Sequence, residues 1–226
     1  MAEVDQAIDP DIDPFSILLG AIGRKDTVGL RELLESDPRY KLEAHRNPNL
    51  LRLAIQNWNT DAVRELIVNG GARVNTRDEY NETMLFAAET PAMVNLLFEL
   101  DPETDIDALN DRDETFAESV ASIGWVKLFR VLLDRGASID VNKILAEAFT
   151  WGQIEMLHEL VVNREIDPWP VKEVLKISHS KYKEKVLPYF QLLTLVSPRM
   201  VNRVGERAVI KNMPSELLRK LKLLLL

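Results

Sequence analysis

The stretch NLLRLAIQNWNTDAVRELIVNGGARVNTRD, residues Asn49–Asp78, contains all parts of one small helical unit. Apolar residues recur at helical spacing before and after Trp58, which predicts two short amphipathic helices separated by a break. Gly70 and Gly71 follow the second helix, where glycine can adopt the left-handed backbone that ends a helix. The stretch therefore predicts a helix, a break, a second helix and a glycine stop.

This unit recurs along the chain. The pair Val74-Asn75 has counterparts at Ile106-Asp107, Ile139-Asp140, Ile166-Asp167 and Val201-Asn202, in steps of 32, 33, 27 and 35 residues. The glycine stop recurs as Gly136 in DRGASID, residues 134–140. Five similar pairs at nearly one spacing predict an internal repeat.

The segments that follow these pairs predict tight turns. DEYNET (78–83), NDRDET (110–115) and NRVGER (202–207) each begin with Asp or Asn, and Asn81, Asp113 or Gly205 stands three residues later. A side chain that bonds its own backbone, followed by a residue that tolerates positive φ, is typical of such turns. Thr83 and Thr115 come two residues later, and we expect them to cap the next helix.

The first helix of each unit is expected to be short. Nine residues separate Thr115 from Gly124 and Lys143 from Gly152, and the same step from Asn49 reaches Trp58. A helix of about eight residues that ends at a glycine-like break fits this spacing.

With these features the chain resembles the ankyrin repeat family. ETMLFAAET (82–90) is similar to the family's T-P-L-H-x-A line, with Met84 and Phe86 in place of proline and histidine. The resemblance covers roughly 15–226 and implies an all-α fold, an ankyrin-type α-solenoid of stacked helix-turn-helix repeats with short hairpin-like turns. It implies about seven units, of which the first and the last two are degenerate, beginning near Phe15, Asn49, Thr83, Thr115, Lys143, Lys172 and Arg207.

Charge divides the chain into unequal parts. Residues 1–14 hold five acids and no base and are expected to form a disordered tail. Residues 1–169 hold 32 acids and 16 bases, whereas residues 170–226 hold 4 acids and 12 bases.

Pro91 and Pro214 each stand where a helix is expected to start, since a missing backbone N–H costs nothing there.

Several function classes are disfavoured by the composition. The chain has no cysteine, no apolar run near the ~18 residues of a membrane span, and no signal-peptide pattern, so we expect a cytoplasmic or nuclear protein without a membrane partner. It lacks a glycine-rich phosphate loop and a nucleophile elbow, and its three histidines (45, 158 and 179) share no ligand spacing. We therefore expect no enzyme activity, no cofactor and no metal site.

One stretch imitates a calcium-binding loop. Residues Glu103–Glu114 place acidic side chains in EF-hand spacing, but Ala108 stands where that loop needs glycine. The same residues are also explained by the turn between two repeats. This favours an acidic, solvated loop.

The ankyrin resemblance implies a concave surface that binds another protein without catalysis. Trp58, Trp125 and Trp151 lie at the breaks between helices, where they either fill joints between repeats or act as binding anchors. The expected contact residues are exposed turn tips and first-helix positions, namely Arg52, Gln56, Arg77, Glu79, Tyr80, Phe86, Leu109 and Arg112.

Two alternatives concern the C-terminal region. Residues 207–226 resemble the F-box-type ends of some ankyrin proteins, which implies an adaptor that recruits a ubiquitin ligase. The basic segment 170–226 suggests nucleic acid or another acidic partner, although its dispersed lysines with few aromatic residues favour a solvated face. Leu223 and Leu226 fall off the apolar stripe of the last expected helix, which suggests weak self-association through that helix.

Overall fold

The computed structural model describes residues 13–151, 153–160 and 164. These residues form ten α-helices and one 3-10 helix, and a single isolated bridge pairs Arg77 with Thr83. The expected all-α class is confirmed. None of the helices in this part of the chain is long and apolar enough to cross a membrane. The chain divides into two compact units between Phe116 and Ala117.

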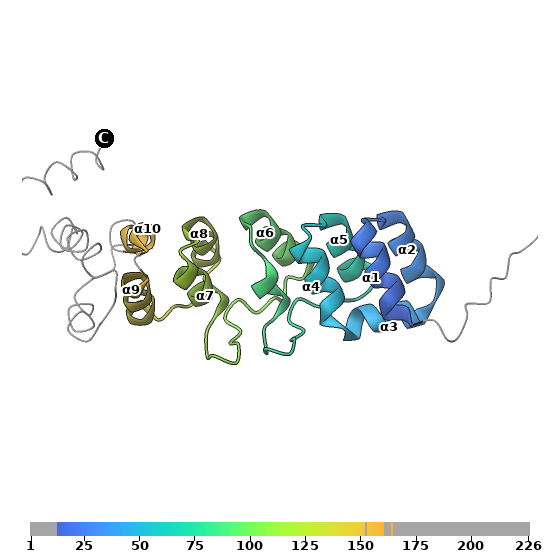
Figure 1. The fold of residues 1–226 in the computed structure, drawn as a ribbon, viewed down its shortest axis with the longest axis horizontal. Coiled ribbons are helices and arrows are strands. Elements are labelled where there is room, and N and C mark those ends of the chain that lie inside the picture. Colours follow the sequence, from blue (N-terminus) through green and yellow to red (C-terminus); the bar gives the residue numbers. More distant parts are fainter. Residues whose placement is uncertain (1–12, 152, 161–163, 165–226) are drawn as a thin grey trace, which may run out of the picture. The chain divides into compact units, whose positions relative to one another are not determined.

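The first unit is built of paired helices around a leucine-rich core. Its elements are α1 (Pro14–Arg24), α2 (Thr27–Ser36), α3 (Pro38–Arg46), α4 (Pro48–Gln56), α5 (Thr60–Val68), η1 (Met84–Ala87) and α6 (Pro91–Leu100) (Figure 1). α1 packs against α2, α3 and α4, and α5 contacts α2, α4 and α6. Leu18, Leu34, Leu51 and Leu66 are fully buried between them, and each such side chain stabilises the fold by about 1.5–3 kcal/mol.

The second unit contains two further helix pairs. Its elements are α7 (Phe116–Ile123), α8 (Val126–Asp134), α9 (Val141–Thr150) and α10 (Ile154–His158). Phe129, Leu132 and Leu157 are fully buried. Arg130 also donates a hydrogen bond to the buried carboxylate of Glu159 at 2.7 Å, which ties α8 to the residues just after α10.

Three helix pairs are joined by the same backbone turn. Lys25, Trp58 and Gly124 have φ values of 57°, 53° and 84° at the α1–α2, α4–α5 and α7–α8 junctions. In each case the N–H of this residue bonds the carbonyl three residues before it, and the next N–H bonds the carbonyl five residues before its own. The breaks expected at Trp58 and Gly124 are confirmed, while Gly152 lies outside the described residues.

The glycine stops and the polar turns are also confirmed. Gly71 and Gly136 have φ values of 71° and 92° and follow the ends of α5 and α8. Asn81 and Asp113 have φ values of 58° and 54°, in the left-handed region that the turn pattern predicted.

Four helices begin with a capping residue followed by proline. The side chains of Asp13, Asp37, Asn47 and Thr90 accept backbone N–H bonds at the starts of α1, α3, α4 and α6. Proline occupies the next position, where its fixed φ suits the first helical residue. Pro14 thus begins α1 and Asp13 caps it, so neither belongs to the predicted tail, of which residues 1–12 lie outside the described part. The same signal at Asp37-Pro38 marks α3, which the repeat template did not predict.

The first helix of the third predicted repeat, which was expected to start at Thr83, differs from its expected form. It is a 3-10 helix of four residues, η1, and Thr83 makes no capping hydrogen bond with its side chain. The capping prediction for Thr83 is therefore wrong. Pro91 starts α6, as expected, and it requires an extended backbone at Thr90, with φ −132° and ψ 147°. Too few residues remain between Thr83 and Thr90 for a full α-helix.

The remaining predictions concern residues that the structure does not describe. The sixth and seventh units, the helix start at Pro214, the F-box-like segment 207–226 and the leucines at 223 and 226 lie outside the described residues.

Candidate functional site

Two polar loops of the first unit form the candidate site. We name residues 78–82 the first tip loop and residues 109–114 the second tip loop. Asp78 Oδ1 accepts the backbone N–H groups of Tyr80 and Glu82, both at 2.9 Å. The Asp78 N–H in turn bonds the Glu82 carbonyl at 3.0 Å, which closes the loop. The loop shape is therefore set by one side chain within the loop.

The second tip loop repeats this arrangement. Asn110 Oδ1 accepts the N–H groups of Arg112 at 2.9 Å and Glu114 at 3.1 Å. The Asn110 N–H bonds the Glu114 carbonyl at 3.0 Å. Both loops thus have one architecture, as the shared sequence pattern indicated.

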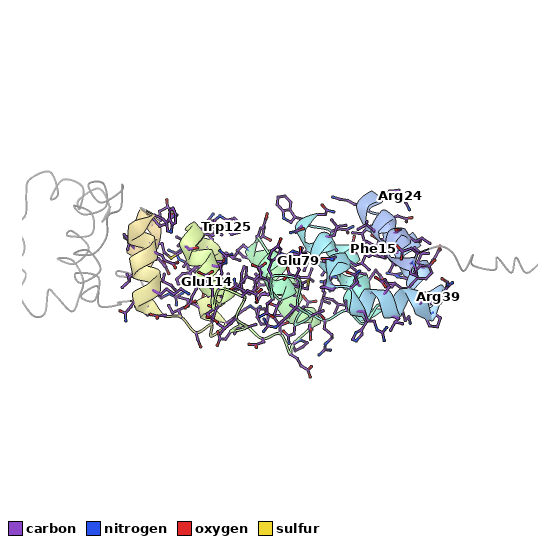
Figure 2. The ribbon with its side chains drawn as sticks, turned by 60° about the horizontal axis from the view of Figure 1, so that its bottom comes forward. Phe15, Arg24, Arg39, Glu79, Glu114 and Trp125 are labelled. Carbon is purple, nitrogen blue, oxygen red and sulfur yellow. The ribbon has the colours of Figure 1, made fainter. Side chains whose placement is uncertain are left out.

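One arginine joins the two loops directly. Arg77 Nη1 donates to the carbonyl of Asn81 at 2.6 Å and to the carbonyl of Leu109 at 2.5 Å. The Asp111 N–H also bonds the Tyr80 carbonyl at 3.3 Å. The loops consequently lie side by side, as Figure 1 shows for the two loops below the helices, and Figure 2 labels Glu79 in the first and Glu114 in the second.

The segments that lead into the loops are also held together. Asn75 donates from its side-chain amide to the Glu103 carbonyl at 2.7 Å and accepts from the Asp105 N–H at 2.8 Å. The N–H of buried Val74 bonds the Asp101 carboxylate at 2.9 Å. These contacts explain why a β-branched residue and Asn occur together at this point: Val74 fills the core while Asn75 fixes the next segment.

Arg52 and Phe86 support the loops. The Arg52 guanidinium forms ion pairs with Asp78 and Glu82, and its side chain is only 20% exposed. Phe86 is half-buried and packs against Phe116, with ring centroids 5.3 Å apart and the ring planes tilted by 50°. Both residues therefore fix the first-helix side of the loops to the core, and a direct contact with a partner stays a prediction for them.

A groove of about 310 Å³ lies between the two loops. Tyr80 and Leu109 are 61% and 45% exposed, although they are large apolar residues. Asn110 is 3% exposed, and its Nδ2 has no hydrogen-bond partner among the described residues. The groove is lined by Tyr80, Glu82, Asn110, Asp111 and Arg112.

Five of the eight predicted contact residues come together at these loops: Arg77, Glu79, Tyr80, Leu109 and Arg112. Gln56 is exposed at the last residue of α4. The prediction missed three residues that line the groove, Glu82, Asn110 and Asp111. Their signal was present, since they belong to the same turn motif as Tyr80 and Arg112.

Residues 103–114, considered above as a calcium loop, form the segment leading into the second tip loop and the loop itself. Asp105 Oδ1 accepts the Asp107 N–H at 3.1 Å within it. Within the described residues, no three His, Cys, Asp or Glu side chains gather as a metal site would require.

No protein-family model matches this chain, and a comparison with curated proteins gives no significant match.

Proposed function

We propose that the chain is a divergent ankyrin-type α-solenoid that acts as a protein–protein interaction scaffold. The recurring junction at Lys25, Trp58 and Gly124 supports a common repeat unit. A scaffold of this type binds through the loops and first helices of consecutive repeats and needs no catalytic group. The cysteine-free composition fits a protein of the cytoplasm or nucleus.

The single observation that carries this proposal is the pair of tip loops that Arg77 joins by hydrogen bonds. Arg77 fixes both loops through two carbonyl groups, so that little loop entropy remains to be lost on binding. The fixed loops nevertheless expose Tyr80 and Leu109, which are apolar groups that a partner can cover. An ordered, exposed and partly apolar surface is the arrangement that favours a protein partner.

The test compares capture of partners by variants of the full chain. The immobilised protein, its Tyr80→Ala/Leu109→Ala variant and a Val28→Ala/Val68→Ala control are incubated with cell lysate, and bound proteins are measured by quantitative mass spectrometry. Val28 and Val68 are 69% and 66% exposed on α2 and α5, outside the two tip loops. We expect specific partners to be lost only from the tip variant.

An identical set of captured proteins for all three forms would contradict the proposed role of the loops. Melting curves for each variant provide the folding control. The two side chains replaced in each variant are exposed, so the melting temperatures should agree within a few degrees.

A further inference from the structure

The tip loops and the segment before the second one carry a net negative charge. Residues 101–114 contain seven acids and one base, and the first tip loop contains three acids and no base. Arg52, Arg73 and Arg112 form ion pairs with five of these ten acids, so the net charge is smaller than the count of acids. Glu79 and Asp111 are exposed and make no ion pair with any residue in the described part of the chain. The field at the groove therefore favours a cationic ligand.

A buried hydrogen-bond donor at the groove is a second, independent observation. In the first tip loop Asp78 has a partner for each carboxylate oxygen, because Arg52 pairs with the oxygen that the turn leaves free. Asn110 has the same place in the second tip loop, but its Nδ2 has no acceptor among the described residues. A buried donor without an acceptor is unfavourable, and a ligand carbonyl would relieve it.

Tyr80 supplies an aromatic surface at the same groove. Its ring is exposed, its carbonyl is bonded to the Asp111 N–H at 3.3 Å, and Tyr80 and Asp111 both line the groove. An arginine or lysine head group placed over an aromatic ring gains attraction from the ring electrons. The ring and the neighbouring carboxylates therefore favour the same kind of ligand.

We infer that this groove binds a basic, extended peptide segment of a partner protein. An arginine or lysine side chain lies over Tyr80 near the Glu79 and Asp111 carboxylates, while a peptide carbonyl accepts the Asn110 Nδ2 hydrogen bond. This inference rests on the proposed function, because it names the chemistry of the partner at the same site.

Fluorescence anisotropy with the full chain tests the inference. The probes are fluorescein-labelled peptides of six Arg-Gly, Lys-Gly or Glu-Gly dipeptides. We expect the Arg-Gly and Lys-Gly peptides to bind and the Glu-Gly peptide not to bind. Affinity should fall as salt is raised from about 50 to about 300 mM, because screening shortens the range of the attraction. Equal affinity for all three peptides would overturn the inference.

Variants at the groove show whether the peptide binds there. Tyr80→Ala and Asp111→Lys should each weaken Arg-Gly binding by about fivefold to tenfold. Glu89→Lys is the matched control, since it makes the same charge change at an exposed position between η1 and α6. An equal loss for Asp111→Lys and Glu89→Lys would mean that overall charge drives binding, which would overturn the groove site.

Asn110→Asp separates the buried donor from the negative charge. The variant keeps the oxygen that closes the second tip loop but removes the N–H donor and adds a carboxylate. We expect weaker binding, because the peptide carbonyl loses its donor. Tighter binding would show that charge alone attracts the peptide and would overturn the inference.

The two proposals fail in different ways. If the basic peptides do not bind, but Tyr80→Ala/Leu109→Ala still loses its captured partners, the peptide chemistry is wrong and the scaffold role stands. If the basic peptides bind at the groove, but capture from lysate is unchanged in that variant, the assigned ligand chemistry of the groove holds and the proposed scaffold role of the loops is wrong.

Discussion

Trp58 is a bulky residue in a backbone conformation that favours glycine. Its φ is 53°, and Gly124 occupies the same place in the α7–α8 junction. The left-handed conformation costs a non-glycine residue about 1–2 kcal/mol, and Trp58 is 62% exposed, so it recovers little of this by burial. We expect Trp58→Gly to raise the free energy of unfolding by about 1 kcal/mol, measured by urea denaturation.

Gly124→Ala provides the opposite control for this junction. Its φ of 84° disfavours alanine, and the added Cβ would collide with the Gln153 side chain. We expect this variant to be less stable than the unmodified chain. A destabilising Trp58→Gly would show instead that the exposed indole contributes packing that outweighs its backbone strain.

Glu65 links stability to pH through an ion pair with Arg31, whose own side chain is 57% exposed. Glu65 is 6% exposed and accepts a hydrogen bond from Arg31 Nε at 2.9 Å, which lowers the pKa of Glu65 below its ordinary value of 4.5. A lowered pKa stabilises the folded state above the unfolded value, and this stabilisation is lost as pH falls through the folded pKa. Glu65→Gln should therefore reduce stability at pH 7, with a difference that shrinks below pH 4.5.

Glu99 is the matched control for the pH series. It pairs with Arg64 at 3.1 Å, but its side chain is 63% exposed, and such pairs contribute little to stability. Thermal melts between acidic and neutral pH compare the two Glu→Gln variants. A pH-independent effect of Glu65→Gln would show that its packing, rather than its charge, matters.

At the scale of the elements, some boundaries follow directly from residue chemistry and others do not. Glycine at positions 71, 124 and 136 indicated a helix break or a helix end, because the left-handed backbone conformation costs little free energy only for glycine. α3 was missed because a repeat template predicts a turn between units, although Asp37-Pro38 is a local start signal. The short length of η1 depends on Pro91, because proline requires an extended backbone at the residue before it, Thr90.

Thr83 and Thr90 give a direct comparison of two threonines near helix starts. Thr90 Oγ1 accepts the Met93 N–H at 3.2 Å and caps α6, whereas the buried Thr83 Oγ1 has no partner among the described residues. Thr90→Val should lower the free energy of unfolding by about 1 kcal/mol through the lost cap. Thr83→Val should be neutral or stabilising, because it removes a buried hydroxyl without a partner.

Equilibrium urea unfolding of both variants measures this difference. The substitution is the same in each case and leaves the side-chain shape nearly unchanged. Equal losses at both positions would mean that Thr83 has a hydrogen-bond partner in solution, such as a buried water.

At the scale of the whole molecule, the candidate site was only partly readable from the sequence. Tyr80, Leu109 and Arg112 were predicted because they stand at the tips of repeated turns. The bond from Arg77 to the Leu109 carbonyl was not predicted, since it joins positions 32 residues apart and depends on how the loops approach each other. The missing partner of Asn110 is likewise visible only when every neighbouring donor and acceptor is placed.

The first compact unit contains both tip loops and its own core, so a fragment of residues 1–116 should fold without the rest of the chain. The helices of this unit pack mainly on one another, so its core needs no segment beyond Phe116. We expect helical circular dichroism, a cooperative urea transition, and the same ~1 kcal/mol gain from Trp58→Gly as in the full chain. The labelled Arg-Gly peptide should also bind the fragment, because every residue assigned to the groove lies within it. A fragment with helical dichroism but no cooperative transition would show that the first unit depends on residues beyond Phe116 for its packing.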